Sequence, residues 1–261
     1  MKTEGACDGR TLRLLSYNIQ VGIASRNFHD YLINGWKHLL PSPDRIVNLQ
    51  RIAELISGYD IVGLQETDAG SLRSHYLNQT EYLADRAGMP YWNTRVNRAM
   101  GYLGQHALGL VARCAPERLD SVPLPSRIPG RGAMVADFMV DNRPLRVVIS
   151  HLSLSAKARH QQMEVIARLL EDAPYGVVMA DFNCTPDSRE IRRLCDMGRL
   201  CLPDQPPATY PSWRPRRAID HVLITGGLSF RRVECLPVGF SDHAPLSVEI
   251  AFEEPPAFTV P

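Results

Sequence analysis

Short apolar runs alternate with amphipathic segments along this chain, and the two patterns predict strands and helices in turn. The run Leu12–Asn18 predicts the first strand. Between Asp44 and Ser57, apolar side chains recur at helical spacing, which predicts a helix with these inward positions: Ile46, Leu49, Ile52, Ala53 and Ile56. Asp44 is the predicted N-cap of this helix, and Gly58 follows its predicted end.

The rest of the chain continues in the same way. Two further segments predict helices, Leu77–Gly88 and Ala156–Asp172, and the second has a continuous apolar face. The remaining predicted strands are Asp60–Glu66, Tyr91–Val96, His106–Ala112, Ala133–Val140, Leu145–His151, Gly176–Asp181, Ile219–Ile224, Phe230–Leu236 and Pro245–Phe252. Many strands with a few interleaved helices are typical of an α/β or α+β fold.

Several of the predicted buried strands end in a residue that can do chemistry. These residues are Asn18, Glu66, His151 and Asp181. Strand ends that converge on one rim of a sheet hold their side chains on rigid supports. The pattern therefore predicts a functional site at one rim of the fold.

Length and charge limit the organisation of the chain. The 261 residues are enough to bury a large core, and the Pro-rich stretches 123–129 and 203–211 are short enough to be loops. We therefore expect one domain over residues 1–261, with its core at about residues 11–252. The 29 Lys and Arg residues nearly balance the 28 Asp and Glu residues, whereas polyanion-binding proteins are usually more basic.

The cysteines and the N-terminal residues bear on the compartment. None of the six cysteines forms a C-x-x-C pair, and their spacing suits neither a zinc knuckle nor a small disulfide scaffold. We therefore expect free thiols in a reducing compartment. Residues 1–10 are polar, and no apolar run reaches the roughly 20 residues that span a bilayer. Together these features predict a cytoplasmic protein.

Six short motifs follow one another at predicted strand ends or in the loops after them: S-Y-N (16–18), L-Q-E (64–66), S-H-L (150–152), D-F-N (181–183), I-D-H (219–221) and S-D-H-A-P-L (241–246). In this order they resemble the endonuclease/exonuclease/phosphatase superfamily, and the resemblance extends from Leu12 to Ile250. It implies a DNase I-like α/β (α+β) four-layer sandwich, in which helices flank two packed mixed β-sheets. It also implies a metal-dependent phosphoesterase.

Phosphate-ester hydrolysis requires a cation on the developing charge, an aimed water and a partner for the leaving oxygen. Mg²⁺ prefers oxygen ligands, and Mn²⁺ is an alternative. Glu66 is the predicted ligand because a buried strand end holds its carboxylate still, and a metal would offset the cost of burial. Asn18 supplies an amide oxygen beside it. Asp242 is a candidate for a further ligand or an outer carboxylate.

The remaining catalytic candidates are two histidines and the D-F-N motif. His151 and His243 suit phosphate binding or proton transfer because the pKa of histidine lies near neutrality. Asp220 is the candidate partner that would favour the imidazolium form of His243. Asp181 and Asn183 point the same way on an extended segment. The resemblance implies that Asp181 activates water and Asn183 orients it, whereas the motif alone would be read as a turn.

Candidates for substrate binding depend partly on the resemblance. DNase I-like members carry an arginine near the phosphate, and Arg131 is the corresponding residue, although a surface arginine is an equal interpretation. His106 stands where relatives often have Asn, so it either replaces that amide or packs in the fold. Trp213 lies among arginines in the loop 210–217, where it would stack on a base or hold a headgroup, or simply line a solvated rim.

Two other segments have a predicted role. Apolar residues of the segment 28–40 fit a helical stripe, which we interpret as packing on the domain rather than as a substrate-gripping element or a transient contact with a membrane surface. Arg159 and Gln162 share one face of the predicted helix that follows His151, and we interpret them as structural ties to neighbouring loops.

These features predict a divalent-metal-dependent phosphoesterase that hydrolyses a lipid, small-molecule or nucleic acid phosphodiester by in-line attack of an activated water. The alternative is specifically a DNA or RNA endo- or exonuclease. A non-catalytic phosphate-binding module is disfavoured, because it would lack at least one of Glu66, Asp181 and His243. The expected partner is a phosphate-ester substrate, and the sequence gives no sign of an obligate protein partner.

Overall fold

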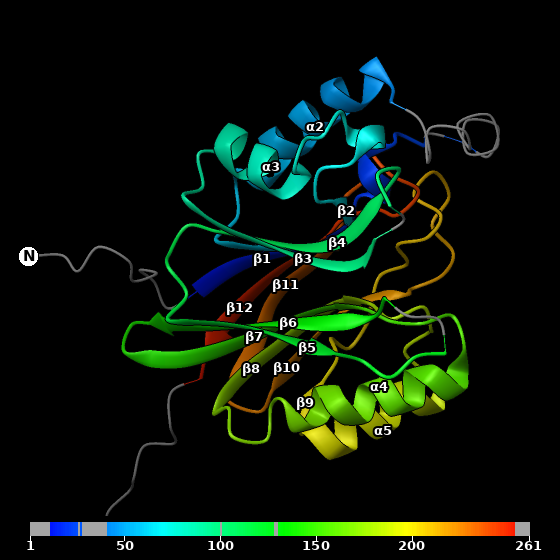
Figure 1. The fold of residues 1–261 in the computed structure, drawn as a ribbon. Helices are drawn as coiled ribbons and strands as arrows, with labels where there is room; N and C mark the ends of the chain where they lie inside the picture. Colours follow the sequence, from blue (N-terminus) through cyan, green and yellow to red (C-terminus); the bar gives the residue numbers. More distant parts are fainter. Residues whose placement is uncertain (1–10, 26, 28–40, 100, 128–129, 254–261) are drawn as a thin grey trace, which may run out of the picture.

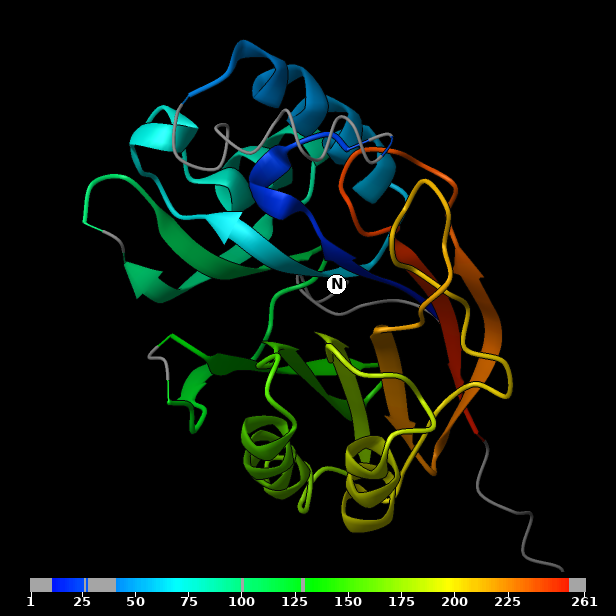
Figure 2. The ribbon, with the colours of Figure 1, turned by 90° about the vertical axis from the view of Figure 1, so that its right-hand side faces the viewer.

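The computed structural model describes residues 11–25, 27, 41–99, 101–127 and 130–253 (Figure 1). Two six-stranded β-sheets pack face to face, and helices cover the outer face of each sheet (Figures 1 and 2). The predicted DNase I-like four-layer arrangement of two mixed sheets flanked by helices is therefore confirmed.

The strands and helices have the following bounds. The first sheet contains β1 (Thr11–Asn18), β2 (Ile61–Asp68), β3 (Tyr91–Ala99), β4 (Gln105–Ala112), β11 (Leu228–Cys235) and β12 (Leu246–Phe252). The second sheet contains β5 (Arg118–Pro123), β6 (Gly132–Val140), β7 (Arg143–His151), β8 (Tyr175–Asp181), β9 (Leu200–Cys201) and β10 (Asp220–Thr225). The helices are α2 (Pro43–Ile56), α3 (Gln79–Ala87), α4 (Ala156–Arg168) and α5 (Arg189–Gly198), with the 3₁₀ turns η1 (Gln20–Gly22) and η3 (Leu72–Ser74).

The order of the strands brings the predicted strand ends together. The first sheet has the order β11-β12-β1-β2-β4-β3 and the second β5-β6-β7-β8-β10-β9. Only β1 with β2 and β7 with β8 run parallel among the named strands that pair, so in each sheet two neighbouring strands end at the same edge. His151 is level with Asp181, and Asp220 begins β10 directly opposite Asp181.

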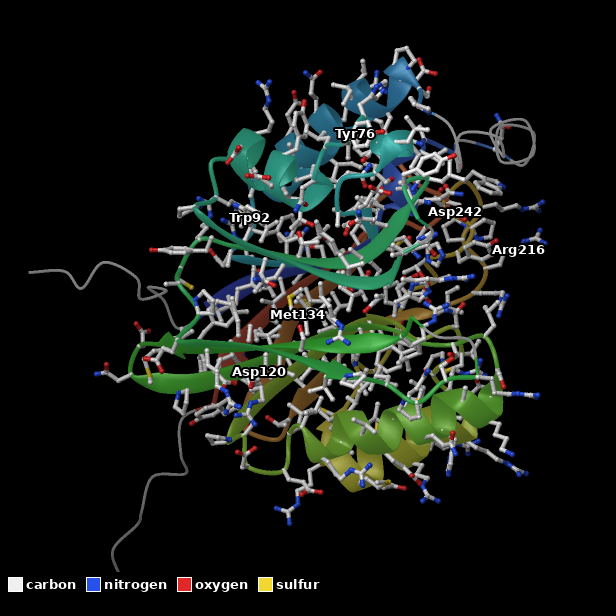
Figure 3. The ribbon with its side chains drawn as sticks, in the orientation of Figure 1. Tyr76, Trp92, Asp120, Met134, Arg216 and Asp242 are labelled. Atoms are coloured by element: carbon white, nitrogen blue, oxygen red, sulfur yellow. The ribbon has the colours of Figure 1, made fainter. Side chains whose placement is uncertain are left out.

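Alternating side chains on each strand build the layers of the core. On β1, Leu12 and Leu14 enter the cluster between the two sheets, whereas Leu15 and Tyr17 pack in the cluster with α2 and α3. The strand β8 divides its side chains in the same way between the inter-sheet core and the layer under α4 and α5. Figure 3 shows Met134 of β6 between the sheets. This burial on both faces explains the long apolar runs in the sequence.

Some elements differ from the sequence predictions. Ser42, not Asp44, is the N-cap residue of α2, and Asp44 lies in the first turn, where a carboxylate favours the helix dipole. The strand β2 continues beyond Glu66 to Asp68. The strand β5 carries almost only exposed side chains, so it has no apolar pattern that would predict it. The helix α5 was also not predicted, although Ile191, Leu194 and Cys195 recur at helical spacing and pack in the core. The apolar stripe in 28–40 lies outside the described residues.

The prediction of free thiols is wrong at one position. Cys114 is disulfide-bonded, whereas four other cysteines are free, namely Cys184, Cys195, Cys201 and Cys235. Disulfides are typical of oxidising environments, so the cysteines no longer argue for a reducing compartment. Among the described residues, no helix is long and apolar enough to cross a membrane.

A close approach of α3 to the first sheet gives a test of this packing. A Cβ atom on Gly109 of β4 would lie 2.5 Å from Thr80 Oγ1 and 2.9 Å from Thr80 Cγ2. The short side chain of Thr80 has little room to move, so Gly109→Ala should lower the free energy of unfolding by about 1–3 kcal/mol. Urea denaturation measures this change. Gly226→Ala is the control, since a Cβ there has no atom within 4 Å, and equal stability of the two variants would contradict the packing.

Candidate active site

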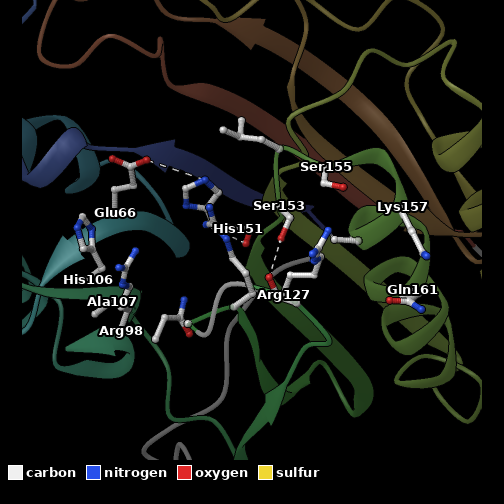
Figure 4. A pocket seen from close by; sticks show the side chains of 16 residues that line it. Glu66, Arg98, His106, Ala107, Arg127, His151, Ser153, Ser155, Lys157 and Gln161 are labelled. Atoms are coloured by element: carbon white, nitrogen blue, oxygen red, sulfur yellow. Dashed lines mark hydrogen bonds and ion pairs between the residues drawn. The ribbon is translucent and has the colours of Figure 1, made fainter. Parts of the chain in front are cut away.

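A β-bulge aims Glu66 away from the ladder of its own sheet. The register between β2 and β4 shifts between Leu64 and Thr67, and Glu66 has a positive φ of 53°. Bulges of this kind redirect one side chain while the strand continues. The Glu66 carboxylate lines a groove, and its Oε1 lies 3.9 Å from His151 Nε2 (Figure 4).

Asp181 lies at the centre of the buried polar residues at this rim. Its Oδ2 accepts a hydrogen bond of 3.1 Å from Asn18 Nδ2, which joins the two sheets at their edges. The same oxygen lies 3.4 Å from His151 Nε2 and 3.8 Å from His243 Nε2. The Asn183 backbone N–H donates to Oδ1 at 3.0 Å. Four residues from separate elements therefore surround one carboxylate.

His243 is held on its other side by Asp220. The Nδ1 atom of His243 lies 2.8 Å from Asp220 Oδ2, and the Thr209 hydroxyl donates to that same oxygen at 2.5 Å. The Tyr210 ring packs on the imidazole, with ring centroids 4.9 Å apart. The sequence suggested the pairing with Asp220 but not the roles of Thr209 and Tyr210, which depend on how the loop 209–217 folds back.

The electrostatics of the two histidines differ. Burial lowers the pKa of His151 well below its usual value, and the charge of Arg131 lowers it further. Burial would also lower the pKa of His243, but Asp220 and Asp181 outweigh that effect and raise it well above the usual value. The structure therefore favours a neutral His151 beside a cationic His243.

The carboxylates of the site are difficult to ionise without further positive charge. Burial raises the pKa of Asp181 to about 7, with Asp220 and Glu66 adding to the rise and His243 opposing it. Burial likewise raises the pKa of Asp242 to about 6, and Glu66 contributes. Because like charges and desolvation both oppose ionisation, a bound cation would stabilise the charged forms.

The donor atoms at this rim fit a divalent cation. Ligand atoms of Asp181, Asp220 and His243 all lie within 4.8 Å of one another, and the buried Oδ1 of Asp220 has no hydrogen-bond partner. Because a cationic His243 bonded to Asp220 is not a metal ligand, the carboxylates of Glu66, Asp181 and Asp242 form the oxygen-rich set that suits Mg²⁺ or Mn²⁺.

The predicted ligands Asn18 and Asp242 are both at this rim. The amide oxygen of Asn18 accepts the Gln20 backbone N–H at 3.1 Å, and its amide nitrogen donates to Asp181. The Asp242 backbone N–H donates to Gln20 Oε1 at 3.2 Å, so one glutamine holds both segments. The oxygen of Asn18 keeps a second lone pair for a metal ligand role.

The groove beside these residues has a volume of about 950 Å³. Glu66, His106 and His151 line it (Figure 4), and Arg131 also belongs to its lining. A guanidinium N–H of Arg131 donates to the His151 carbonyl oxygen at 3.3 Å, which places this arginine in the wall. Burial lowers the pKa of Arg131, while the charges of Glu66 and Asp181 oppose that change.

A buried ion pair determines the tautomer of His106. Arg73 lies in a buried ion pair with Asp68 at 2.5 Å, and its NH1 lies 3.3 Å from His106 Nε2. A guanidinium has only donors, so Nε2 must accept and the ring proton lies on Nδ1. His106 therefore lines the groove with its Nε2 facing Arg73. The Asp68–Arg73 pair was not found from the sequence, although D-A-G-S (68–71) is a turn signal.

Two predicted residues lie farther from the groove. Asn183 has a positive φ of 53°, and its side-chain amide donates to the Leu152 carbonyl oxygen at 3.0 Å, which ties together the loops after β7 and β8. Trp213 is not among the described residues that line the groove, so its role in substrate binding stays a prediction.

Comparisons with known proteins agree with this geometry. The model of the endonuclease/exonuclease/phosphatase family matches residues 15–243. The chain belongs to this family. Members of the endonuclease/exonuclease/phosphatase family are hydrolases that act on phosphate esters, and they typically depend on a divalent metal. No curated protein sequence is significantly similar to the chain.

Solved structures of the family share the fold at low sequence identity. A family protein from Beutenbergia cavernae is 19% identical with a TM-score of 0.72, over 94% of this chain and 72% of that one. The human nocturnin catalytic domain, solved with a bound sulfate anion, is 15% identical with a TM-score of 0.68, over 94% and 95% of the two chains. A mannosyl-6-phosphatase from Bacteroides thetaiotaomicron is 16% identical with a TM-score of 0.67, over 92% and 100%.

The pairing of His243 with Asp220 can be tested in the metal-free protein. Asp220→Asn removes the negative charge that most favours the imidazolium, so the pKa of His243 should fall. An NMR titration of the ring signals of His243 measures the change. The partly exposed His160, which lies beside Glu164, serves as the control. An unchanged pKa of His243 would show that Asp220 does not set its charge.

Proposed function

We propose that this chain is a divalent-metal-dependent phosphoesterase that hydrolyses a phosphodiester by in-line attack of water. The observation that carries this proposal is the convergence of carboxylates and two histidines around Asp181, from strand ends of both sheets. Membership of a family of phosphoester hydrolases supports the reaction class.

The metal site is proposed at Glu66, with Asn18 and Asp242 as its neighbours. Mg²⁺ is the proposed ion, with Mn²⁺ as the alternative, because all three side chains offer oxygen ligands. The ion, when bound, would offset negative charge on the phosphate. The bulge at Glu66 keeps the carboxylate at the groove while Asn18 remains bonded to Asp181.

Asp181 is the proposed base that takes a proton from the attacking water. Its carboxylate lies beside both histidines at the rim, and a positioned carboxylate can act as a general base. Asn183 is proposed to orient the water. Its backbone N–H fixes the Asp181 carboxylate, and its side chain fixes the neighbouring loop.

Positive and neutral donors then hold the phosphate. Asp220 holds Nδ1 of the cationic His243, and its Nε2, which lies 3.8 Å from Asp181 Oδ2 and so beyond hydrogen-bond distance, is proposed to donate to the phosphate. His151 supplies a neutral ring on the other side of Asp181. Arg131 and His106 line the groove, where the guanidinium and the imidazole ring are proposed to contact phosphate oxygens.

The substrate class, contact with a membrane and the cellular compartment are more specific proposals. The groove accepts a lipid, small-molecule or nucleic acid ester on chemical grounds, and specific nuclease activity is the alternative. Contact of the segment 28–40 with a membrane surface and a cytoplasmic location also stay predictions.

Removal of the central groups should abolish turnover. With Mg²⁺ or Mn²⁺ and bis-p-nitrophenyl phosphate, Glu66→Ala, Asp181→Ala and His243→Ala should each lower kcat by about 10²–10⁴-fold. A chelator should stop the wild-type reaction. Glu54→Ala changes an exposed glutamate and His160→Ala a partly exposed histidine, neither of which lines the groove, and both should keep the wild-type rate. Wild-type rates in the three variants, with circular dichroism showing that they are folded, would refute the proposed site.

The donor role of His106 predicts a difference between two substitutions. His106→Ala should lower kcat/KM for bis-p-nitrophenyl phosphate by about tenfold to a hundredfold, because a hydrogen bond to a charged group is lost. His106→Gln should keep most of the activity, since its amide still donates. Steady-state kinetics of both variants test this, and an equal loss in the two would leave only a packing role for His106.

A further inference from the structure

The groove is far more positive than the chain as a whole. Its lining includes Arg98, Arg127, Arg131 and Lys157, and Glu66 is the only carboxylate among the described residues that line it. Over the full sequence, acidic and basic residues nearly balance, at 28 and 29. The positive charge is therefore a property of this groove rather than of the whole molecule.

The catalytic residues occupy only part of the groove. Glu66, His106 and Arg98 lie toward one side in Figure 4, whereas Lys157 and Gln161 of α4 lie toward the other, with Arg127 between them. We call the part lined by Arg127, Lys157 and Gln161 the distal part. A volume of about 950 Å³ lies at the upper end of the roughly 300–1,000 Å³ found for small-molecule sites. A single phosphate group fills a small fraction of that space.

Buried polar contacts hold the wall of the distal part in place. Gln162 of α4 is fully buried, and it accepts the Ser153 backbone N–H at 2.9 Å while donating to the Pro125 carbonyl oxygen at 2.9 Å. It therefore ties the loop after β7 to the loop after β5. Arg159 donates further hydrogen bonds to the carbonyl oxygens of Ser153 and Leu154. Arg159 and Gln162 therefore tie α4 to neighbouring loops, as predicted. Arg127 follows directly in the loop after β5.

Helix stability gives no reason for a lysine at position 157. Lys157 lies in the first turn of α4, which contains no acidic residue, and the N-cap Ser155 makes no side-chain capping bond. A cation near a helix N-terminus opposes the helix dipole. Lys157 instead belongs to the lining of the groove. Ser126 and Gln161 supply hydroxyl and amide groups nearby, whereas the Ser153 hydroxyl accepts from Gln162 and lies 3.3 Å from the Ser126 hydroxyl.

We infer that the substrate carries a second anionic group, bound by Arg127 and Lys157 in the distal part and joined to the scissile phosphate by a hydroxyl-bearing body such as a sugar or polyol. The catalytic end of this arrangement rests on the proposed function. The guanidinium of Arg127 and the ammonium of Lys157 are two cations that suit a phosphate or a carboxylate. The serine and glutamine side chains match the hydroxyl groups of the body.

Competitive inhibition tests the inference. Hexitol 6-phosphate and hexitol 1,6-bisphosphate differ only in the second anion, and each is added to wild-type enzyme hydrolysing bis-p-nitrophenyl phosphate with Mg²⁺. The inhibition constant of the bisphosphate should be at least about tenfold lower than that of the monophosphate, because one charge-assisted hydrogen bond contributes about that much to affinity. The double variant Arg127→Gln/Lys157→Gln should lose this difference.

The control double variant Arg51→Gln/Arg168→Gln removes two exposed cations elsewhere, one of them at the other end of α4, and should keep the difference. Equal inhibition by the two hexitol phosphates in wild-type enzyme would overturn the inference. A second result would also overturn it: the distal substitutions weaken inhibition by a single-stranded oligonucleotide but leave inhibition by the bisphosphate unchanged. That result would assign the distal part to a nucleic acid backbone.

A second measurement does not depend on catalysis. N-hydroxysuccinimidyl acetate modifies Lys157, and peptide mass spectrometry separates this site from the other two lysines of the chain. The bisphosphate should slow the acetylation of Lys157 severalfold more than the monophosphate, and equal rates would count against the inference. If bis-p-nitrophenyl phosphate is not hydrolysed at all, the proposed function fails, while this protection still decides whether the distal part binds an anion.

Discussion

The buried carboxylate of Asp181 is the feature on which the rest of the site depends. It accepts the amide of Asn18 from the other sheet, and it lies near Glu66, Asp220 and His243. Burying one ionised carboxylate is costly, and neighbouring carboxylates increase the cost unless positive charge compensates for them. The cationic His243 supplies part of that charge, and the crowded oxygens leave a divalent cation as the natural source of the remainder.

The fold supplies this crowding through two parallel strand pairs. Because β1 and β2 end together in one sheet and β7 and β8 end together in the other, the packed sheets bring four strand ends to one rim. The rim also needs departures from regular structure. The bulge at Glu66 redirects a side chain, and positive φ angles at Glu66 and Asn183 turn the chain toward the groove. Such departures are frequent where side chains are positioned for function.

The sequence predicts the parts of the site that local patterns determine. Asn18, His151 and Asp181 end apolar runs that are buried on both faces, so their positions follow from strand periodicity. Other parts depend on contacts between distant residues. Arg73 and His106 are 33 positions apart, and no local pattern shows that they meet. The strand β5 is exposed at almost every position, and the cross-link at Cys114 depends on a partner that spacing does not identify.

Net charge proved a coarse guide because it averages over the whole surface. The groove concentrates arginines and a lysine around a single carboxylate, and walls of low dielectric strengthen their field locally. Outside the groove the balance of charges provides little long-range attraction, and salt screens exposed charges beyond about 8–10 Å. For the proposed phosphoesterase, selection among phosphate esters would therefore depend on contacts inside the groove. There, the rigid wall fixed by Gln162 sets the separation between the catalytic residues and Lys157.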